Sequence, residues 1–326
     1  MEARPLGRSG LTVGRLALGT MTWGRETDQF DAREQLLEFV DAGGTLVDTA
    51  DVYADGGSES LLGSLLDHAV SRADLVIATK AVSRPGTSRR FDASRRHLLD
   101  SLDRSLMRLK IDVIDLWQLH AWDPLTPLDE SLGAVEEAVR SGRVRYAGVS
   151  NYAGWQLTRA AATSTSLRIP LVSSQMEYSL VERGIEREVI PAALDAGIGI
   201  LPWSPLGRGV LTGKYRYGIP ADSRAATGPF SGFVSAHMGD HQRHIVDAVC
   251  IAAEGLGLPP TSVALSWVRD RPGVTAPIVG ARTVGQLRQA LASESLTLPT
   301  QIREALDDVS AIPRGYPDHG WNQRGS

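Results

Sequence analysis

A short apolar segment that ends abruptly in a small or polar residue occurs eight times along this chain, and amphipathic segments lie between the copies. Successive endings are 24 to 40 residues apart, except for one interval of 77 residues. A strand followed by a helix, repeated eight times, is the pattern of a (β/α)8 TIM barrel. The eight segments end at the following residues: Gly19, Asp48, Lys80, His120, Asn151, Gln175, Trp203 and Gly280.

The segments between these strands carry apolar residues at helical spacing, for example over residues 32–44, 94–110 and 127–142. A doubly wound sheet is the competing fold. It requires a G-x-G-x-x-G fingerprint after its first strand, and "LALGTMTWG" (16–24) does not supply one. The pattern therefore favours an α/β barrel that forms a single domain over residues 1–326.

Three parts of the chain lie outside the repeat. Residues 2–13 are typical of a β-hairpin with a glycine-containing turn. Residues 204–233, rich in Gly, Pro and Ser, predict a long loop after the seventh strand, which we expect over the barrel mouth. From about residue 299 we expect one more helix, followed by a loose tail over 313–326.

The charge composition disfavours two classes of binding partner. Lys and Arg number 34 against 38 Asp and Glu, a net charge of −4 with both signs interspersed, which disfavours nucleic acid and anionic membranes. The chain has no apolar run of about 18 residues and no apolar leader, so we expect a cytoplasmic protein. The single cysteine, Cys250, lies among apolar residues at helical spacing and is expected to be a buried, inert thiol. The oligomeric state stays open.

Several of the strand ends carry ionisable side chains. Because the active site of such a barrel lies at the carboxyl ends of its strands, these side chains should meet at one mouth. Each alone could have a structural role, such as a turn cap or a solvated charge. The convergence of four ionisable groups, namely Asp48, Lys80 and His120 at strand ends and Tyr53 in the loop after Asp48, favours a functional site.

The chemistry follows from matching pKa values. A tyrosine hydroxyl, with an ordinary pKa of about 10, becomes a usable proton donor if the ammonium of Lys80 stabilises its phenolate, and Tyr53 is placed for this role. Asp48 would hold Lys80, and the neutral imidazole of His120 could orient a carbonyl. Such a site can protonate a carbonyl under reduction, provided that a hydride is available.

The segment 46–63 organises part of this site. We expect a strand that delivers Asp48, a loop that presents Tyr53, and a helix capped by Ser58. Asp51 is interpreted as a loop residue that the site does not require.

The remaining strand ends offer a place for a nicotinamide cofactor. Ser150, Asn151 and Gln175 supply donors and acceptors for its carboxamide, while Trp203 could stack on its ring. The segment "SPLGRGVLTGK" (204–214) offers backbone N–H groups and two cations for a pyrophosphate.

A second anion site is expected after the last strand. The segment "GARTVGQL" (280–287) places Arg282 and Thr283 at a helix N-terminus, where a 2′-phosphate could bind. This favours NADP(H) over NAD(H).

Taken together, eight segments resemble the aldo-keto reductase family, in particular its bacterial branch related to potassium-channel β subunits. They occur in the family's order and at its spacing over nearly the whole chain. The segments read "GTMTWG", "LVDTADVYADGGSESLLG", "ATK", "QLHAWDPLTPLDESL", "RYAGVSNY", "SSQMEYSL", "LPWSPLGRGVLTGKY" and "PIVGARTVGQL".

The resemblance implies NADPH-dependent reduction of a small-molecule aldehyde or ketone, with Tyr53 as general acid, Lys80 and Asp48 as its tuning pair, and His120 orienting the carbonyl. It implies a substrate pocket formed by Trp23, Tyr53, His120 and Trp122. The cofactor contacts that it implies are Gly19, Thr20, Met21, Asp48, Ser150, Asn151, Gln175, Trp203, Ser204, Pro205, Leu206, Gly207, Arg208, Lys214, Gly280, Ala281, Arg282, Thr283 and Gln286.

Two positions depart from the family pattern. Ala290 stands where the family often has an asparagine that meets the adenine, so we expect a weaker grip on the cofactor. Arg208 stands where a small residue is common, and its role stays open.

Two other functions are weighed. A barrel aldolase would use Lys80 in a Schiff base, but that reading leaves Gln175, Trp203 and Arg282 without a role. A cofactor-binding regulatory subunit would keep the same residues with little turnover.

A metal site is also considered. His237, His241 and His244 fall at i, i+4 and i+7 and would share a helix face, which suits zinc. A solvated helix face is favoured, and no metal is expected.

Overall fold

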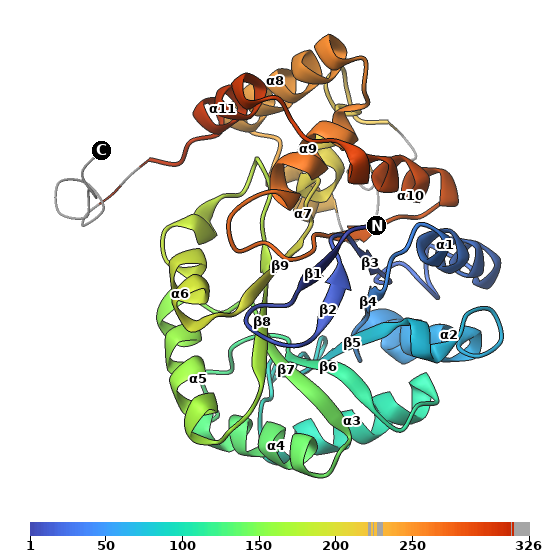
Figure 1. Cartoon of the computed structure of the whole chain (residues 1–326), viewed down its shortest axis with the longest axis vertical. Helices are drawn as coiled ribbons and strands as arrows, with labels where there is room; N and C mark the ends of the chain where they lie inside the picture. The colour runs from blue at the N-terminus through green and yellow to red at the C-terminus, as the bar shows by residue number, and fades with distance from the viewer. Residues whose placement is uncertain (221–222, 224, 227–230, 314, 316–326) are drawn as a thin grey trace.

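The structure, a computed structural model, describes residues 1–220, 223, 225–226, 231–313 and 315. Its main sheet has eight parallel strands in the order β10-β3-β4-β5-β6-β7-β8-β9. The sheet closes because the Ile200 N–H donates to the Gly273 carbonyl (2.8 Å) and the Thr275 N–H donates to the Ile200 carbonyl (2.9 Å). Figure 1 shows the resulting ring, and the predicted barrel is confirmed. The strands are β3 (Ala17–Gly19), β4 (Leu46–Asp48), β5 (Val76–Ala81), β6 (Ile114–Leu119), β7 (Val144–Ser150), β8 (Leu171–Glu177), β9 (Gly199–Trp203) and β10 (Ile278–Gly280).

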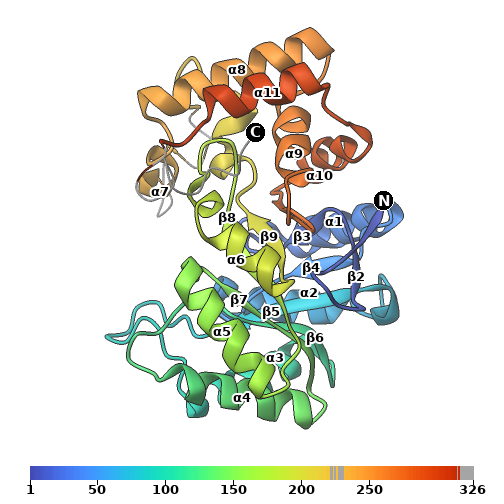
Figure 2. The same ribbon diagram turned by 60° about the vertical axis from the view of Figure 1, so that its left-hand side comes forward.

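Helices surround this ring, and α8 and α11 lie side by side beyond it (Figures 1 and 2). The predicted helices over 32–44, 94–110 and 127–142 correspond to α1, α3 and α4. In the described part of the chain no single helix is long and apolar enough to cross a membrane, although α8 and α9, bent by 106°, meet the length and composition test as a pair. The helices are α1 (Gln29–Asp41), α2 (Gly57–Leu65), α3 (Arg95–Leu109), α4 (Leu128–Arg140), α5 (Gly154–Ser166), α6 (Val189–Ala196), α7 (Ser231–Ser235), α8 (Asp240–Leu256), α9 (Pro260–Arg269), α10 (Val284–Leu291) and α11 (Thr300–Val309).

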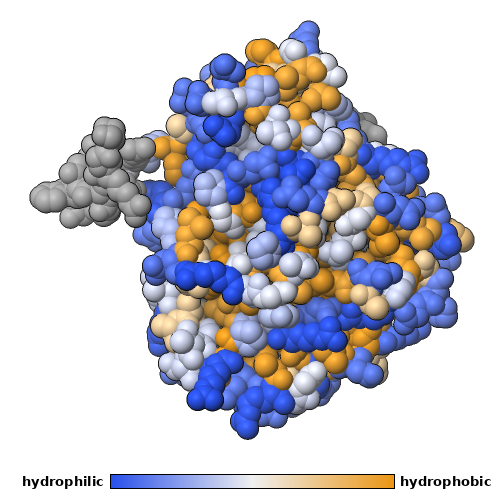
Figure 3. Space-filling view, in the orientation of Figure 1, coloured by the Kyte–Doolittle hydropathy of each residue, from blue (hydrophilic) through white to orange (hydrophobic). Residues whose placement is uncertain are grey.

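The predicted hairpin is present as β1 (Ala3–Pro5) paired antiparallel with β2 (Thr12–Gly14). It closes the amino-terminal end of the barrel, because Leu6 and Val13 are buried in one apolar cluster with strand residues from inside the ring. Gly7 permits this approach: its φ is +59°, and a Cβ there would lie 2.5 Å from the Gly197 carbonyl. On this face polar and apolar side chains are interspersed (Figure 3).

Side-chain alternation along the strands places polar groups directly above the apolar cluster that contains Leu6 and Val13. Leu46 and Ala78 belong to the inner cluster, so Asp48 and Lys80, two residues further along β4 and β5, point inward one layer higher. Leu116 of β6 places Gln118 in the same layer. The barrel therefore separates an apolar floor from a polar mouth.

The long interval after the seventh barrel strand is only partly loop. It contains a 3-10 helix, η4 (Gly207–Thr212), and then α7, before α8 begins at Asp240. Residues 221–222, 224 and 227–230 lie outside the described residues, as does most of the tail predicted over 313–326. The helix expected after residue 299 is α11.

Candidate active site

A buried ion pair forms the base of the mouth. The Lys80 ammonium donates to Asp48 Oδ2 and to the Thr49 carbonyl, both at 2.7 Å, and the lysine side chain is completely buried. Burial alone would lower the pKa of Lys80, but the charge of Asp48 and the nearby Tyr53 more than offset this and raise it. Lys80 therefore stays a cation.

Tyr53 lies directly above the pair, with its hydroxyl 3.4 Å from Lys80 Nζ. Burial raises the pKa of Tyr53, and Lys80 opposes the rise without cancelling it. Lys80 favours the phenolate, as expected, but burial outweighs its effect, so the pKa of Tyr53 lies above its ordinary value. Tyr53 keeps its proton, which is what a proton donor requires.

The turn directly after Tyr53 has a strained backbone. This turn has positive φ at Ala54 (50°) and Asp55 (54°), and also at Gly56 (89°), the N-cap of α2. Two successive non-glycine residues in the left-handed region persist only where the surroundings fix them, and such strain is concentrated at functional sites. Asn151 and Ser204, at two other strand ends, also have positive φ.

His120 completes the group at the carboxyl end of β6. Its ring meets that of Tyr53 edge-on, with centroids 6.1 Å apart. Burial, together with the charge of Lys80, lowers the pKa of His120 to about 3, and its Nδ1 has no hydrogen-bond partner among the described residues. The imidazole is therefore neutral at physiological pH.

Amide side chains fix the acid and the aromatic wall. Gln175 donates to Asp48 Oδ1 at 2.8 Å. The Asn151 amide donates to the His120 carbonyl (3.0 Å) and accepts from Trp203 Nε1 (3.1 Å). Asn151 therefore links the backbone of His120 to the indole of Trp203.

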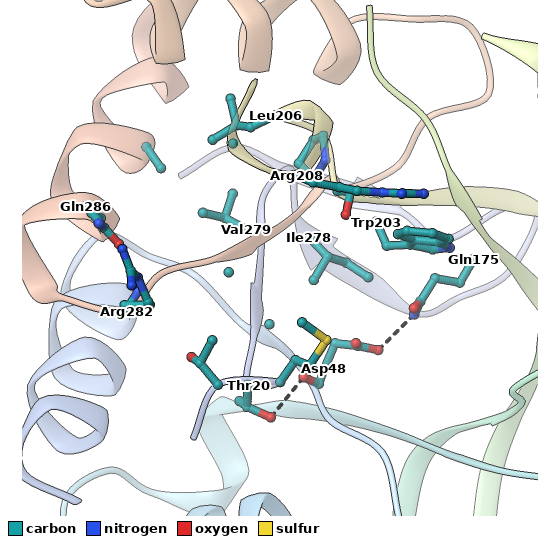
Figure 4. Close-up of a pocket in the computed structure, with 18 of the residues that line it drawn as sticks. Thr20, Asp48, Gln175, Trp203, Leu206, Arg208, Ile278, Val279, Arg282 and Gln286 are labelled. Carbon is teal, nitrogen blue, oxygen red and sulfur yellow. Dashed lines mark hydrogen bonds between the residues drawn. The ribbon is translucent and has the colours of Figure 1, made fainter. Parts of the chain in front are cut away.

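A cavity of about 490 Å³ opens above these residues (Figure 4). Most of the predicted site residues line it, and Lys80 lies beneath Tyr53, below the cavity surface. The predicted residues on its wall are Gly19, Thr20, Met21, Asp48, Tyr53, His120, Ser150, Asn151, Gln175, Trp203, Ser204, Pro205, Leu206, Arg208, Lys214, Gly280, Arg282 and Gln286.

Some predicted residues lie elsewhere. Trp23 is completely buried and its indole N–H donates to Gln35 of α1 (3.0 Å), so it packs in the core instead of lining the predicted substrate pocket. Trp122 packs edge-on against Tyr152 and Trp155, outside this cavity. Gly207, Ala281 and Thr283 are likewise not on its wall.

The cavity also has lining residues that the sequence reasoning missed. Ile278 could have been found from strand alternation, and Gln289 from its position one helical turn after Gln286. Thr261, on α9, has no local signal. The missed residues are Thr22, Gly209, Thr212, Thr261, Ile278, Val279 and Gln289, and the wall also includes Ala290, which was noted for its departure from the family pattern.

Ser58 does not have the predicted role. Gly56 precedes α2 as its N-cap, and Ser58 lies inside the helix. Its buried hydroxyl donates to the Thr20 carbonyl (2.8 Å) and lies 2.8 and 3.1 Å from the hydroxyls of Thr20 and Thr49. It therefore ties α2 to the segments that follow β3 and β4.

Asp51 lies in the turn after β4, as predicted. Its Oδ1 is buried with no partner among the described residues. Burial, and then the nearby Glu59, raise the pKa of Asp51 to about 7.

The three histidines do not lie together on one helix face. His237 precedes α8, so it does not share the helix face of His241 and His244, and within the described ranges no group of metal-ligating side chains is found. Instead, His237 Nε2 lies 3.0 Å from Glu177 Oε1.

The residues on the cavity wall suit an anionic ligand that carries a flat ring. Trp203 offers an aromatic face near Tyr53 and His120, whereas Arg282 lies at the other end, before the N-terminus of α10. Lys214 lines the wall from the segment after η4. These residues could hold a nicotinamide ring, a pyrophosphate and a further phosphate.

Comparison with known proteins places the chain among oxidoreductases. It matches the model of the aldo/keto reductase family over residues 15–311. The uncharacterized oxidoreductase YrpG of Bacillus subtilis (strain 168) is 38% identical, over 97% of this chain and 98% of that protein. Probable voltage-gated potassium channel β subunits of Oryza sativa subsp. japonica and Arabidopsis thaliana are 32% and 33% identical, each over 97% of this chain and 98% of their own length.

The depressed pKa of His120 predicts a pH dependence of stability. Between pH 6.5 and about 3 the unfolded chain binds a proton on this imidazole that the folded chain does not, so the free energy of unfolding falls as the pH falls. From pH 7 to 5 the wild type should lose about 2 kcal/mol more than His120→Gln in urea unfolding. The exposed His68, changed to Gln, is the control and should follow the wild type. Parallel curves for His120→Gln and wild type would contradict the assignment.

The ion pair predicts a non-additive stability effect. Lys80→Met leaves the Asp48 carboxylate buried without its cation and should lower the free energy of unfolding by about 3–5 kcal/mol. Adding Asp48→Asn should recover part of that loss, because no buried charge remains. Denaturant unfolding of Lys80→Met, Asp48→Asn and the double variant checks this, and a double variant as unstable as the sum of the two single ones would argue against a coupled pair.

Proposed function

Because the chain belongs to the aldo/keto reductase family, we propose that it reduces an aldehyde or ketone to the alcohol, with NADPH as the source of hydride. The observation that carries the proposal is the Tyr53 hydroxyl, held 3.4 Å from the Lys80 ammonium beside His120 at one end of the cavity. The proposal names a small-molecule carbonyl compound as the substrate.

In this mechanism Tyr53 is the general acid. Its hydroxyl donates a proton to the carbonyl oxygen as the carbonyl carbon is reduced. The phenolate that remains is stabilised by Lys80, whose positive charge is maintained by Asp48. The buried pair thus acts at the moment when negative charge develops on the tyrosine oxygen.

His120 orients the carbonyl. A neutral imidazole can donate one hydrogen bond to the substrate oxygen, and it adds no positive charge next to Lys80. The proton therefore comes from Tyr53, since an imidazole with a pKa of about 3 has no second proton to give at neutral pH.

The cofactor, when bound, supplies the hydride. Its carboxamide would meet Asn151 Oδ1, which can accept a second hydrogen bond, and the Gln175 amide. Trp203 would cover its ring. Lys214 would face the pyrophosphate, and Arg282 the 2′-phosphate.

A second candidate function is a cofactor-binding regulatory subunit with little turnover. The similarity to probable potassium channel β subunits favours keeping it. Comparing the affinity for NADPH with the rate of NADPH oxidation separates the two, since a regulatory subunit would bind without oxidising. A Schiff-base aldolase fits poorly, because Lys80 is completely buried and its raised pKa keeps the amine protonated.

Tyr53→Phe should lower the rate of carbonyl reduction by about 10²–10⁴-fold, the usual contribution of a general acid. NADPH affinity should stay nearly unchanged. Steady-state NADPH oxidation with a panel of aldehydes, ketones, quinones and sugars measures the first quantity, and a binding titration measures the second. A variant that retains most of its activity would rule out Tyr53 as the proton donor.

Arg282→Ala should reduce the preference for NADPH over NADH, because its guanidinium would face the 2′-phosphate that NADH lacks. Dissociation constants for both cofactors give the ratio. Arg288→Ala is the matched control: this arginine lies on α10 but pairs with Glu38, away from the cavity. If the ratio is unchanged in Arg282→Ala, the 2′-phosphate binds elsewhere.

A further inference from the structure

Two features that the sequence left unexplained meet at one carboxylate. Arg208 donates to Glu177 through Nε (2.8 Å) and Nη2 (2.6 Å), so the pair is bidentate. His237 Nε2 lies 3.0 Å from the same carboxylate. Glu177 ends β8, Arg208 belongs to η4 and His237 follows α7, so the cluster joins the barrel rim to the chain that passes over it.

This cluster touches the aromatic wall of the cavity. The Arg208 guanidinium lies over the Trp203 ring, 5.9 Å from its centroid. Figure 4 shows the indole between Arg208 on one side and Asp48 and Gln175 on the other. Glu177 and Trp203 are paired residues in the register of β8 and β9, so the carboxylate and the ring start from adjacent points of the sheet.

Strain indicates that the geometry is specific. Arg208 has a φ of 59°, a left-handed conformation that is unfavourable for a non-glycine residue. Such a conformation persists only where contacts fix it, and a bidentate arginine–carboxylate pair is a strong contact. The three side chains are largely dry, with exposed fractions of 17% for Glu177, 12% for Arg208 and 7% for His237.

The charge state is consistent with this arrangement. Burial alone would raise the pKa of Glu177, but the hydrogen bonds from His237 and Arg208 lower it. Glu177 is therefore a carboxylate at neutral pH.

We propose that Glu177 is a positioning residue for the cofactor-binding wall: it holds Arg208 against the outer face of Trp203, so that the indole presents a fixed surface to the nicotinamide. The described contacts of Trp203 then include the Asn151 amide at its edge and Arg208 on its outer face, and both restrain the ring. A ring ordered before binding loses less freedom when the ligand arrives, which increases affinity. The inference rests on the proposed use of NADPH.

A rival role for Arg208 makes the opposite prediction. Arg208 also lines the cavity, so it could bind a cofactor phosphate directly. In that case Glu177 would compete with the phosphate for the guanidinium, and its removal would leave NADPH affinity unchanged or increase it. If Glu177 is a positioning residue, its removal weakens binding.

The test is a binding titration of NADPH with the full chain carrying Glu177→Gln. We expect the dissociation constant to rise about tenfold, because the glutamine cannot hold both guanidinium nitrogens as a carboxylate does. Glu186→Gln is the matched control. Glu186 is also bidentate to an arginine, Arg183, and is similarly buried, with 21% of its side chain exposed. Its partner Arg183 does not line the cavity, whereas Arg208 does.

Both glutamine variants should lose thermal stability, so stability alone does not separate positioning from a structural role. NADPH affinity does: Glu186→Gln should stay within twofold of wild type. An unchanged or lower dissociation constant in Glu177→Gln, with normal binding by the wild type, overturns the positioning role alone. If the wild type does not bind NADPH, the proposed function falls and this inference falls with it.

A double variant tests whether Glu177 acts through Arg208. In an Arg208→Gln background, Glu177→Gln should change the dissociation constant by less than twofold, whereas a further tenfold loss would overturn the proposal. Should Glu177→Gln fail to fold, Glu177→Asp serves in its place, because it keeps the charge but is too short to hold both guanidinium nitrogens in the same position. Its NADPH affinity should fall about tenfold, and wild-type affinity would overturn the proposal.

Discussion

The buried pair of Lys80 and Asp48 is the interaction on which the candidate site depends. Removing two charges from water is costly, and their mutual attraction offsets the cost only if further hydrogen bonds satisfy the remaining atoms. Here the Thr49 carbonyl accepts from the ammonium, and Gln175 donates to the carboxylate. A pair satisfied in this way gives Tyr53 a permanent cation below its hydroxyl without leaving an unpaired charge in the barrel.

The barrel makes such a pair possible by layering its interior. Alternate residues of neighbouring parallel strands point inward at similar heights, so Leu46 and Ala78 of the inner apolar cluster lie directly below Asp48 and Lys80. Leu6 of the hairpin closes the opposite end. The polar layer thus lies on an apolar layer and opens only toward the mouth of the barrel. The low dielectric around the buried polar groups strengthens each charge interaction.

The parts of this structure that could be predicted are those that local periodicity determines. Apolar runs and their polar ends gave the strands, and strand ends gave most of the cavity wall, because a parallel barrel brings all carboxyl ends together. Ser58, Trp23 and His237 were misplaced because their partners are distant in sequence: Thr20, Gln35 and Glu177 become neighbours only after the helices and the chain after η4 pack. The raised pKa of Tyr53 was not predicted for a related reason: the burial that raises it cannot be read from the spacing of residues.

Asn151 shows why the four residues Asp48, Tyr53, Lys80 and His120 and the proposed cofactor-binding residues are better regarded as one site than as two. Its amide spans the His120 carbonyl and the Trp203 indole, and its φ of 58° is a conformation that asparagine tolerates better than most residues. A shift of Trp203 would therefore reach the backbone that carries the imidazole, and Arg208 and Glu177 restrain that same indole from its outer face. The Asn151 side chain thus takes part both in the hydrogen bond that orders Trp203 and in the one that holds the backbone of His120. Loss of order at Trp203 is therefore expected to make the position of the imidazole less precise, and the reverse is also expected.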